Sequence, residues 1–286
     1  MFVEEFINSV MDTNLSIRRD KMARQSLKNI HRLIEAATTQ MPVNQQFVAD
    51  LKVSIEKQDS LVGRKPSKSY KPSSMACIRN MYFQVTGTEA DEERSNACLV
   101  GICESGSDRH EHIQAAVTKM KDFGIDCEYI DVEKFVKMRK LDYLEIVKKQ
   151  GFETKLYHKD LNMSFLCDGI IKYKGQYYIL EIKTETIYKW QSREGVAEEH
   201  IPQGTAYSTC LGIDQILFLY ENRDNCDKKA FILEVSDDMK YDYIVSRIEE
   251  CDGYVSRLIP PPKPIDISKK TCQYCNYKYE CRKAGK

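Results

Sequence analysis

The sequence predicts an α/β fold, because strand-like and helix-like segments alternate through its second half. Three segments rich in β-branched and aromatic residues begin at about Phe152, and two more follow at about 215–221 and 230–235. Helical patterns at 194–211 and 239–258 separate or follow these strands. Strands interleaved with helices in this way are typical of a sheet covered by helices.

The first three strand segments lie close together in the chain. They are FETKLYH at 152–158, FLCDGIIKYK at 165–174 and YYILEIKTE at 177–185. The second and third are separated by two turn residues, so we expect them to pair as an antiparallel hairpin.

The hairpin turn is predicted to set the register of this pair. Gly175 and Gln176 fit a two-residue type II′ turn, which requires glycine first. That register places Asp168 directly opposite Lys183, and Glu181 diagonal to Asp168 on the same face. Diagonal residues are about 7–8 Å apart at the backbone. The two carboxylates are therefore expected to reach one hard divalent cation between them.

The opposite face of the hairpin is expected to be the packed one, leaving the carboxylate face for chemistry. Its apolar side chains would pack against helices; they are Phe165, Cys167, Ile171, Tyr173, Tyr178, Leu180 and Ile182. Glutamate and lysine two residues apart also occur by chance in exposed strands, so the hairpin alone leaves an ordinary charged strand as the alternative.

Two regions are predicted along the chain. Residues 1–64 carry apolar positions at helical spacing and are expected to form a helical N-terminal region. A stretch rich in proline, serine and lysine at 65–74 marks the boundary, so the catalytic domain is expected at 65–286. The run IPPPKP at 259–264 would be a stiff tether before the C-terminal segment.

Charge and hydropathy narrow the class of protein. The 286 residues include 43 basic and 43 acidic side chains, so any polynucleotide path must be local. The segment RKPSKSYK at 64–71 offers one basic patch, although a solvated loop would look the same. No run reaches the roughly 18 apolar residues of a membrane helix, and the acidic start does not resemble a signal peptide. We therefore expect a soluble, cytoplasmic protein that contacts no membrane.

Four of the eleven cysteines are spaced as metal ligands. Cys272, Cys275 and Cys281 lie in the run CQYCNYKYEC, and Cys77 lies well upstream. A Cys-x2-Cys pair with a third cysteine close behind is a strong metal signal, and thiolates suit either zinc or an iron-sulfur cluster. The remaining cysteines lack such spacing and are expected to be small buried side chains; they are Cys98, Cys103, Cys127, Cys167, Cys210, Cys226 and Cys251.

Three motifs in order resemble a known nuclease family. Asp168 followed by EIKT at 181–184 resembles the active-site signature of the PD-(D/E)XK nuclease superfamily. Upstream, GSDRH at 106–110 resembles the glycine-to-histidine motif of its RecB-like branch, and QGTAY at 203–207 resembles the Gln-x3-Tyr motif of that branch. The cysteine pattern is similar to the iron-sulfur subgroup that includes the CRISPR adaptation nucleases and the AddB nuclease domain.

The resemblance covers about residues 72–281 and implies a restriction-endonuclease-like core, a mixed sheet flanked by helices. It implies that His110, Asp168, Glu181 and the backbone carbonyl of Ile182 bind Mg²⁺ or Mn²⁺. His112 competes with His110 for this role, although its spacing from the glycine fits less well.

The resemblance also assigns catalytic and cluster residues. Asp168, Glu181 and Lys183 would form the catalytic set, in which the lysine orients the attacking water. Gln203 and Tyr207 would steady the lysine or the nucleic-acid backbone. The cluster ligands would be the four spaced cysteines, Cys77, Cys272, Cys275 and Cys281, holding a structural 4Fe-4S cluster, with Zn²⁺ as the alternative.

The function implied is that of a metal-dependent DNA exonuclease acting on single-stranded DNA or DNA ends. Its partners would be DNA and recombination, replication or CRISPR adaptation proteins. One alternative is a catalytically inactive DNA-binding or assembly protein of the same fold, against which the complete set of Asp168, Glu181 and Lys183 argues. Another is an endonuclease stapled by zinc.

Overall fold

The computed structural model describes residues 42–62, 66–91, 96–265, 267, 269–273 and 275–285. The chain divides into two units between Lys57 and Gln58. Helix α2 (Val43–Leu61) begins in the first unit, continues through the division and buries none of its side chains. Residues 1–41 of the predicted helical region, and 64 and 65 of the predicted basic patch, lie outside the described residues.

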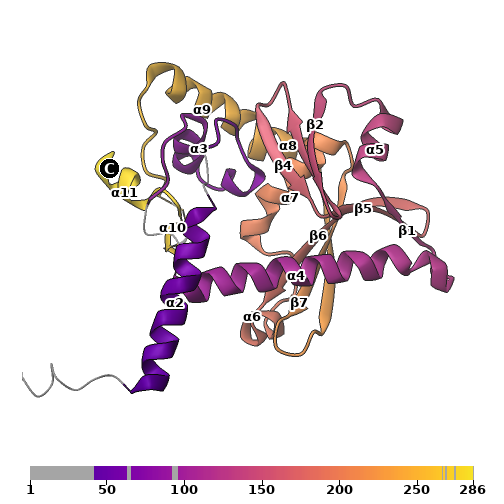
Figure 1. Cartoon of the computed structure of the whole chain (residues 1–286). Helices are drawn as coiled ribbons and strands as arrows, with labels where there is room; N and C mark the ends of the chain where they lie inside the picture. Colours follow the sequence, from indigo (N-terminus) through magenta and orange to yellow (C-terminus); the bar gives the residue numbers. More distant parts are fainter. Residues whose placement is uncertain are drawn as a thin grey trace, which may run out of the picture. The chain divides into compact units, whose positions relative to one another are not determined.

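Two sheets form the centre of the second unit (Figure 1). A five-stranded sheet has the order β1-β5-β6-β7-β8, with β6 and β7 parallel and the other neighbours antiparallel. A three-stranded sheet has the order β2-β3-β4 and is antiparallel. The strands are β1 (Cys127–Ile130), β2 (Leu144–Gln150), β3 (Glu153–His158), β4 (Met163–Cys167), β5 (Gly169–Tyr173), β6 (Gln176–Glu185), β7 (Gln215–Asn222) and β8 (Lys228–Glu234).

Helices surround these sheets, so the predicted α/β class with a mixed central sheet flanked by helices is confirmed. They are α3 (Ile78–Val85), α4 (Ala97–Lys119), α5 (Val132–Arg139), α6 (Ile187–Gln191), α7 (Ile201–Leu211), α8 (Asp237–Lys240), α9 (Ser246–Arg257), α10 (Lys269–Gln273) and α11 (Lys278–Lys283). The tether at 259–264 is neither helix nor strand, as predicted. Within the described ranges, no helix has the length and apolar character needed to cross a bilayer.

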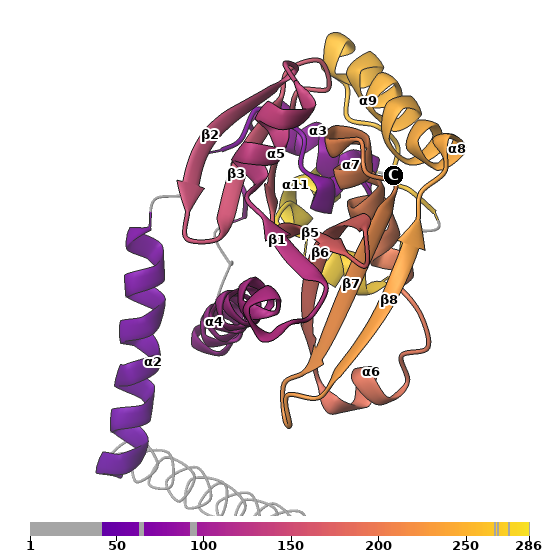
Figure 2. The ribbon, with the colours of Figure 1, turned by 90° about the vertical axis from the view of Figure 1, so that its right-hand side faces the viewer.

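Helices α4 and α7 cover opposite faces of the five-stranded sheet (Figure 2). Ile113 of α4 packs with Leu180 and Ile182 of β6. On the other face, Ile179 joins the main core together with Ala206 of α7. The expectation of one packed face and one open face is therefore wrong, because α7 lies over the face that carries the carboxylate of β6.

The predicted strand at 165–174 is two strands. β4 ends at Cys167, β5 begins at Gly169, and the chain passes from the three-stranded to the five-stranded sheet at Asp168. Phe165 and Cys167 therefore belong to the main core rather than to the face that carries Ile171. The change of sheet puts Asp168 beside both sheets at once.

The turn of the β5–β6 hairpin lies one residue earlier than predicted. Lys174 and Gly175 are the two turn residues, with φ of 49° and 81°. Positive φ at both positions defines a type I′ turn, whereas the prediction was a type II′ turn at Gly175 and Gln176. The prediction failed because Lys174 adopts a left-handed conformation that is uncommon for a residue with a Cβ atom.

The register of the hairpin moves by two residues as a result. Gly169 pairs with Leu180, and continuing this register by one residue places Asp168 opposite Glu181 rather than opposite Lys183. The predicted direct pairing of Asp168 and Lys183 is wrong. A shift of two residues nevertheless keeps the side chains of β5 and β6 on their predicted faces.

The helical stretch predicted at 194–211 is shorter than expected. A 3-10 turn, Glu198–His200, leads into α7, and Pro202 lies in its first turn, where no backbone N–H is needed. Gly204 lets α7 approach the sheet closely, since a Cβ atom there would lie 3.0 Å from the ring of Phe218.

The cysteines outside the spaced set divide into two groups. Cys127, Cys167, Cys210 and Cys251 are buried, as predicted, whereas Cys98, Cys103 and Cys226 are exposed, so for these three the prediction is wrong.

His200 is expected to make the fold sensitive to acid. Its Nδ1 lies 2.9 Å from the Tyr220 hydroxyl, which accepts the Ala197 N–H and can donate its own proton to a neutral imidazole. Burial, with the charge of Lys183, lowers the pKa of His200 from 6.5 to about 3. The unfolded chain takes up this proton below pH 6.5 and the folded chain does not, so stability is lost as pH falls through this range.

The measurement is the free energy of unfolding of the wild type and His200→Gln at several pH values. Below pH 6.5, the wild type should lose about 1.4 kcal/mol per pH unit more than the variant. Equal slopes for the two proteins would contradict the assignment of this titration to His200.

Candidate active site

Asp168 is held by its backbone and by its side chain. Its Oδ2 accepts the backbone N–H of Ile182 at 2.8 Å. Its carbonyl oxygen accepts Gln114 Nε2 at 2.7 Å and the Tyr129 hydroxyl at 3.1 Å. Three donors from α4, β1 and β6 therefore fix a residue that is only 7% exposed.

The tyrosine contact requires glycine at the next position. A Cβ atom on Gly169 would lie 2.5 Å from the Tyr129 ring, well inside van der Waals contact. The Tyr129 hydroxyl also donates to the Phe152 carbonyl, so the ring is not free to move aside.

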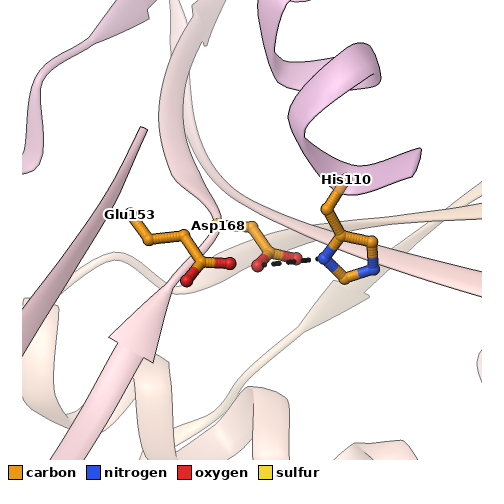
Figure 3. A group of neighbouring side chains, drawn as sticks. All are labelled: His110, Glu153 and Asp168. Atoms are coloured by element: carbon orange, nitrogen blue, oxygen red, sulfur yellow. Dashed lines mark ion pairs between the residues drawn. The ribbon is translucent and has the colours of Figure 1, made fainter. Parts of the chain in front are cut away.

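Three possible metal ligands converge at Asp168. His110 Nδ1 lies 3.5 Å from Asp168 Oδ1, and one atom each of His110, Glu153 and Asp168 lie within 4.8 Å of one another. Figure 3 shows His110 projecting from α4 and Glu153 from the neighbouring strand, with the Asp168 carboxylate between them. Two carboxylates and an imidazole suit a divalent cation such as Mg²⁺ or Mn²⁺.

Glu153 was not predicted, and the β3–β4 register explains its place. Thr154 pairs with Cys167, so continuing the register by one residue places Glu153 opposite Asp168. The sequence pattern predicts the strand that contains Glu153 but not the strand with which it pairs. No local motif marks this glutamate.

Burial and mutual repulsion act against the charged forms of these carboxylates. Burial and the charge of Asp168 raise the pKa of Glu153. Burial alone would lower the pKa of His110, but its hydrogen bond and charge interaction with Asp168 outweigh burial and raise it. A cation at this position would compensate the repulsion between the carboxylates.

A second group of side chains lies on the α7 face of β6. Glu181 Oε1 accepts Lys183 Nζ at 2.6 Å and Gln203 Nε2 at 2.9 Å. Gln203 Oε1 accepts Lys183 Nζ at 3.1 Å, and its Nε2 also lies 2.9 Å from the Tyr207 hydroxyl. These four residues form one network in which each side chain positions the next.

Glu181 is 3% exposed, and charges of both signs act on its carboxylate. Burial raises its pKa; Lys183 acts in the opposite direction and Asp168 raises it further, to about 7 overall. Lys183 therefore stabilises the carboxylate in the absence of a metal ion. Among the described residues, Glu181 lies outside the group whose ligand atoms meet within 4.8 Å.

The remaining predicted residues fall in two places. The contact of Ile182 with the site is through its N–H, and a ligand role for its carbonyl stays a prediction. His112 is exposed, whereas His110 faces Asp168.

Helix α4 is anchored next to His110. Arg109 Nε and Nη2 donate to the two oxygens of Glu221 at 2.6 and 2.8 Å. The Glu221 side chain is fully buried, and Lys228 lies 3.0 Å from it. This bidentate pair fixes the rotation of α4, which directs His110 toward Asp168 and Gln114 toward the Asp168 carbonyl.

The four spaced cysteines line one cavity of about 410 Å³. Cys77 directly precedes α3, and Cys272 lies in α10. Cys275 lies between α10 and α11, and Cys281 lies in α11. Burial raises the pKa of the Cys77 and Cys275 thiols, with a further contribution from the neighbouring cysteines. The structure thus brings together residues that are about two hundred positions apart in the sequence.

The cavity also contains hydrogen-bond donors to sulfur. Arg79, 2% exposed, donates to the Pro261 carbonyl at 2.7 Å, to the Cys281 carbonyl at 2.9 Å and to Cys281 Sγ at 3.4 Å. The Tyr277 N–H donates to Cys275 Sγ at 3.4 Å. Donors of this kind stabilise thiolate ligands.

The spacing of the thiols bears on the metal. Tetrahedral zinc, with Zn–S bonds of about 2.3 Å, would bring its sulfurs to within about 3.8 Å of one another. In the described part of the chain, no three of these sulfurs meet within 4.8 Å.

Comparison with solved structures finds distant structural likenesses. The crystal structure of SSO0001 is 13% identical, with a TM-score of 0.42 over 81% of this chain and 94% of that one. The alkaline exonuclease LHK-Exo from Laribacter hongkongensis is 12% identical, with a TM-score of 0.39 over 68% and 92%. The structure of LHK-Exo in complex with dAMP is 14% identical, with a TM-score of 0.39 over 67% of this chain and 91% of that one. Likenesses at this level are too distant to assign an activity to this chain.

No protein-family model and no curated protein matches the sequence.

Glu153 is expected to contribute to metal binding. Glu153→Gln removes one negative ligand from the group, so Mn²⁺ affinity should fall at least about tenfold in a calorimetric titration. The matched control is Glu145→Gln, an exposed position on β2 of the same sheet. Equal Mn²⁺ affinity in the two variants would contradict the assignment.

Proposed function

We propose that this protein is a metal-dependent DNA nuclease, an exonuclease acting on single-stranded DNA or DNA ends. The observation that carries the proposal is the convergence of His110, Glu153 and Asp168 beside the Glu181–Lys183 ion pair. The preference for DNA and for ends comes from the sequence resemblance to RecB-like nucleases.

Some of these residues would bind the cation, and others would contact the substrate. His110, Glu153 and Asp168 would hold a divalent ion, and Glu181 would join them once Lys183 turns to the substrate. A bound ion would polarise the scissile phosphate and lower the pKa of the attacking water.

Lys183 is the residue best placed to act on the reacting atoms. Its side chain is 21% exposed, and its ammonium is held between Glu181 and Gln203. Once it turns from Glu181 to the substrate, it would orient the water and stabilise charge that develops on the phosphate oxygens. Gln203 and Tyr207 would act through the lysine, as positioning residues.

We also propose that the four spaced cysteines hold a structural 4Fe-4S cluster. The support is the common cavity, the N–H donors to two of its sulfurs and the sequence resemblance to the iron-sulfur subgroup. The group would take no part in hydrolysis. It would tie the segment before α3 to the C-terminal helices α10 and α11 and stabilise the domain.

Lys183→Ala should abolish most of the nuclease activity. Loss of one electrostatic donor at a reacting phosphate lowers the rate by about 10²–10³-fold. The measurement is degradation of end-labelled single-stranded and duplex DNA with Mn²⁺ or Mg²⁺, using protein purified without oxygen. Lys172→Ala, on the neighbouring strand β5, is the control and should retain activity.

Two outcomes would count against this assignment. DNA that stays intact with the wild type and both metals would favour a catalytically inactive binding or assembly protein. Cleavage of closed circular DNA would favour an endonuclease, since an exonuclease requires a free end.

Metal analysis of the purified protein tests the cluster. We expect about four iron and four sulfide per chain and little zinc. Cys275→Ala should lose the iron and lower the melting temperature, because the cross-link between distant segments is lost. Cys226→Ala, an exposed cysteine outside the cavity, is the control. One zinc ion per chain in place of iron would contradict the proposal.

A further inference from the structure

The outer face of the three-stranded sheet leads directly to the proposed metal ligands. Directly opposed residues share a face, so the β3–β4 register forms rows across the sheet. Glu153 and Asp168 form the end row, Lys155 pairs with Leu166 in the next, and Tyr157 pairs with Ser164 in the third. Lys155 lies two residues from Glu153, which is about 6.6 Å along the strand.

This face carries positive charge next to the metal group. Lys148 of β2 pairs with Lys155, so two lysines share the second row. Lys71 lies nearby, since desolvation and the ammonium of Lys155 both lower the pKa of Lys71. Neither Lys71 nor Lys155 has an ion-pair partner among the described residues. The Lys71 and Lys148 side chains therefore lie near Lys155.

Apolar groups on the same face are left open to solvent. Leu166 is 46% exposed and Val147, at the β2 bulge, is 49% exposed. The Tyr157 hydroxyl is held by Asn162 Oδ1 at 3.0 Å, and its ring is half-buried. Lysines interleaved with apolar and aromatic side chains are typical of surfaces that bind single-stranded nucleic acid through phosphates and base faces.

Acidic residues on this face are confined to its two ends. Glu153 belongs to the metal group, and Glu145 pairs with Tyr157 in the row farthest from that group. The middle row therefore has only positive and apolar side chains, which is the charge pattern that a polyanion requires.

We propose that this outer face of β2, β3 and β4 binds the single DNA strand adjoining the scissile phosphate. Lys155, with Lys71 and Lys148, would contact the neighbouring phosphates, and Leu166 would contact a sugar or base. The inference rests on the proposed nuclease function and adds the path of its substrate.

The test is binding of a fluorescently labelled oligo(dT) strand to the full-length protein without added divalent metal. Affinity is measured by fluorescence anisotropy over a range of salt concentrations. Lys155→Ala should reduce the slope of log affinity against log salt by about 0.7, the value expected for one phosphate contact on a single strand. Lys119→Ala, 66% exposed on α4, is the matched control and should leave the slope unchanged.

A second variant separates the apolar contact from charge. Leu166→Ala should lower affinity about fivefold or more without changing the salt slope, because it removes a contact with a base or sugar and no charge. Ile232→Ala, 51% exposed on β8, is its control. Circular dichroism of each variant checks that the fold is intact.

The outcomes distinguish this inference from the nuclease proposal. If the wild type cleaves DNA but Lys155→Ala and Leu166→Ala bind like their controls, the strand path is wrong and the nuclease proposal stands. If both variants lose affinity as expected and the wild type cuts no DNA, the path is supported and the nuclease proposal fails. A wild type that binds no single strand would overturn the path outright.

Discussion

The geometry of the candidate site depends on one crossing point, the passage of the chain from the three-stranded to the five-stranded sheet at Asp168. Because the residue lies between β4 and β5, one neighbour across the register is Glu153 and the other is Glu181. The hydrogen bond from the Ile182 N–H to its carboxylate ties the crossing to β6. Two sheets thus bring three carboxylates together although no helix or hairpin contains all three.

Close carboxylates repel one another, and side chains of the surrounding elements reduce that repulsion. Lys183 supplies positive charge from β6, whereas burial, with a further contribution from the charge of Asp168, raises the pKa values of Glu153 and Glu181. Helix α4 is held in place by the Arg109–Glu221 ion pair, which keeps the backbone of His110 in position beside Asp168. A divalent cation bound at the proposed site would reduce the remaining repulsion between the carboxylates.

The cysteine cavity lies where distant parts of the chain meet. The segment at Cys77 and the C-terminal helices meet around it, and Arg79 links this region to the tether through the Pro261 carbonyl. A bound cluster would add covalent links to a region made of short helices and loops, which have little apolar surface of their own to bury.

The hairpin pattern predicted the grouping of Asp168, Glu181 and Lys183, and the family resemblance added Gln203 and Tyr207. The amino-acid pattern alone predicted the α/β class, most strand positions and the faces of β5 and β6. These follow from alternation and helical spacing, which are local properties of the chain. The hairpin register could be read only from the folded structure, since Lys174 takes a left-handed conformation that local propensity disfavours. The folded structure alone decided the place of Glu153 as well, because strand pairing is a contact between segments and leaves no mark within either of them.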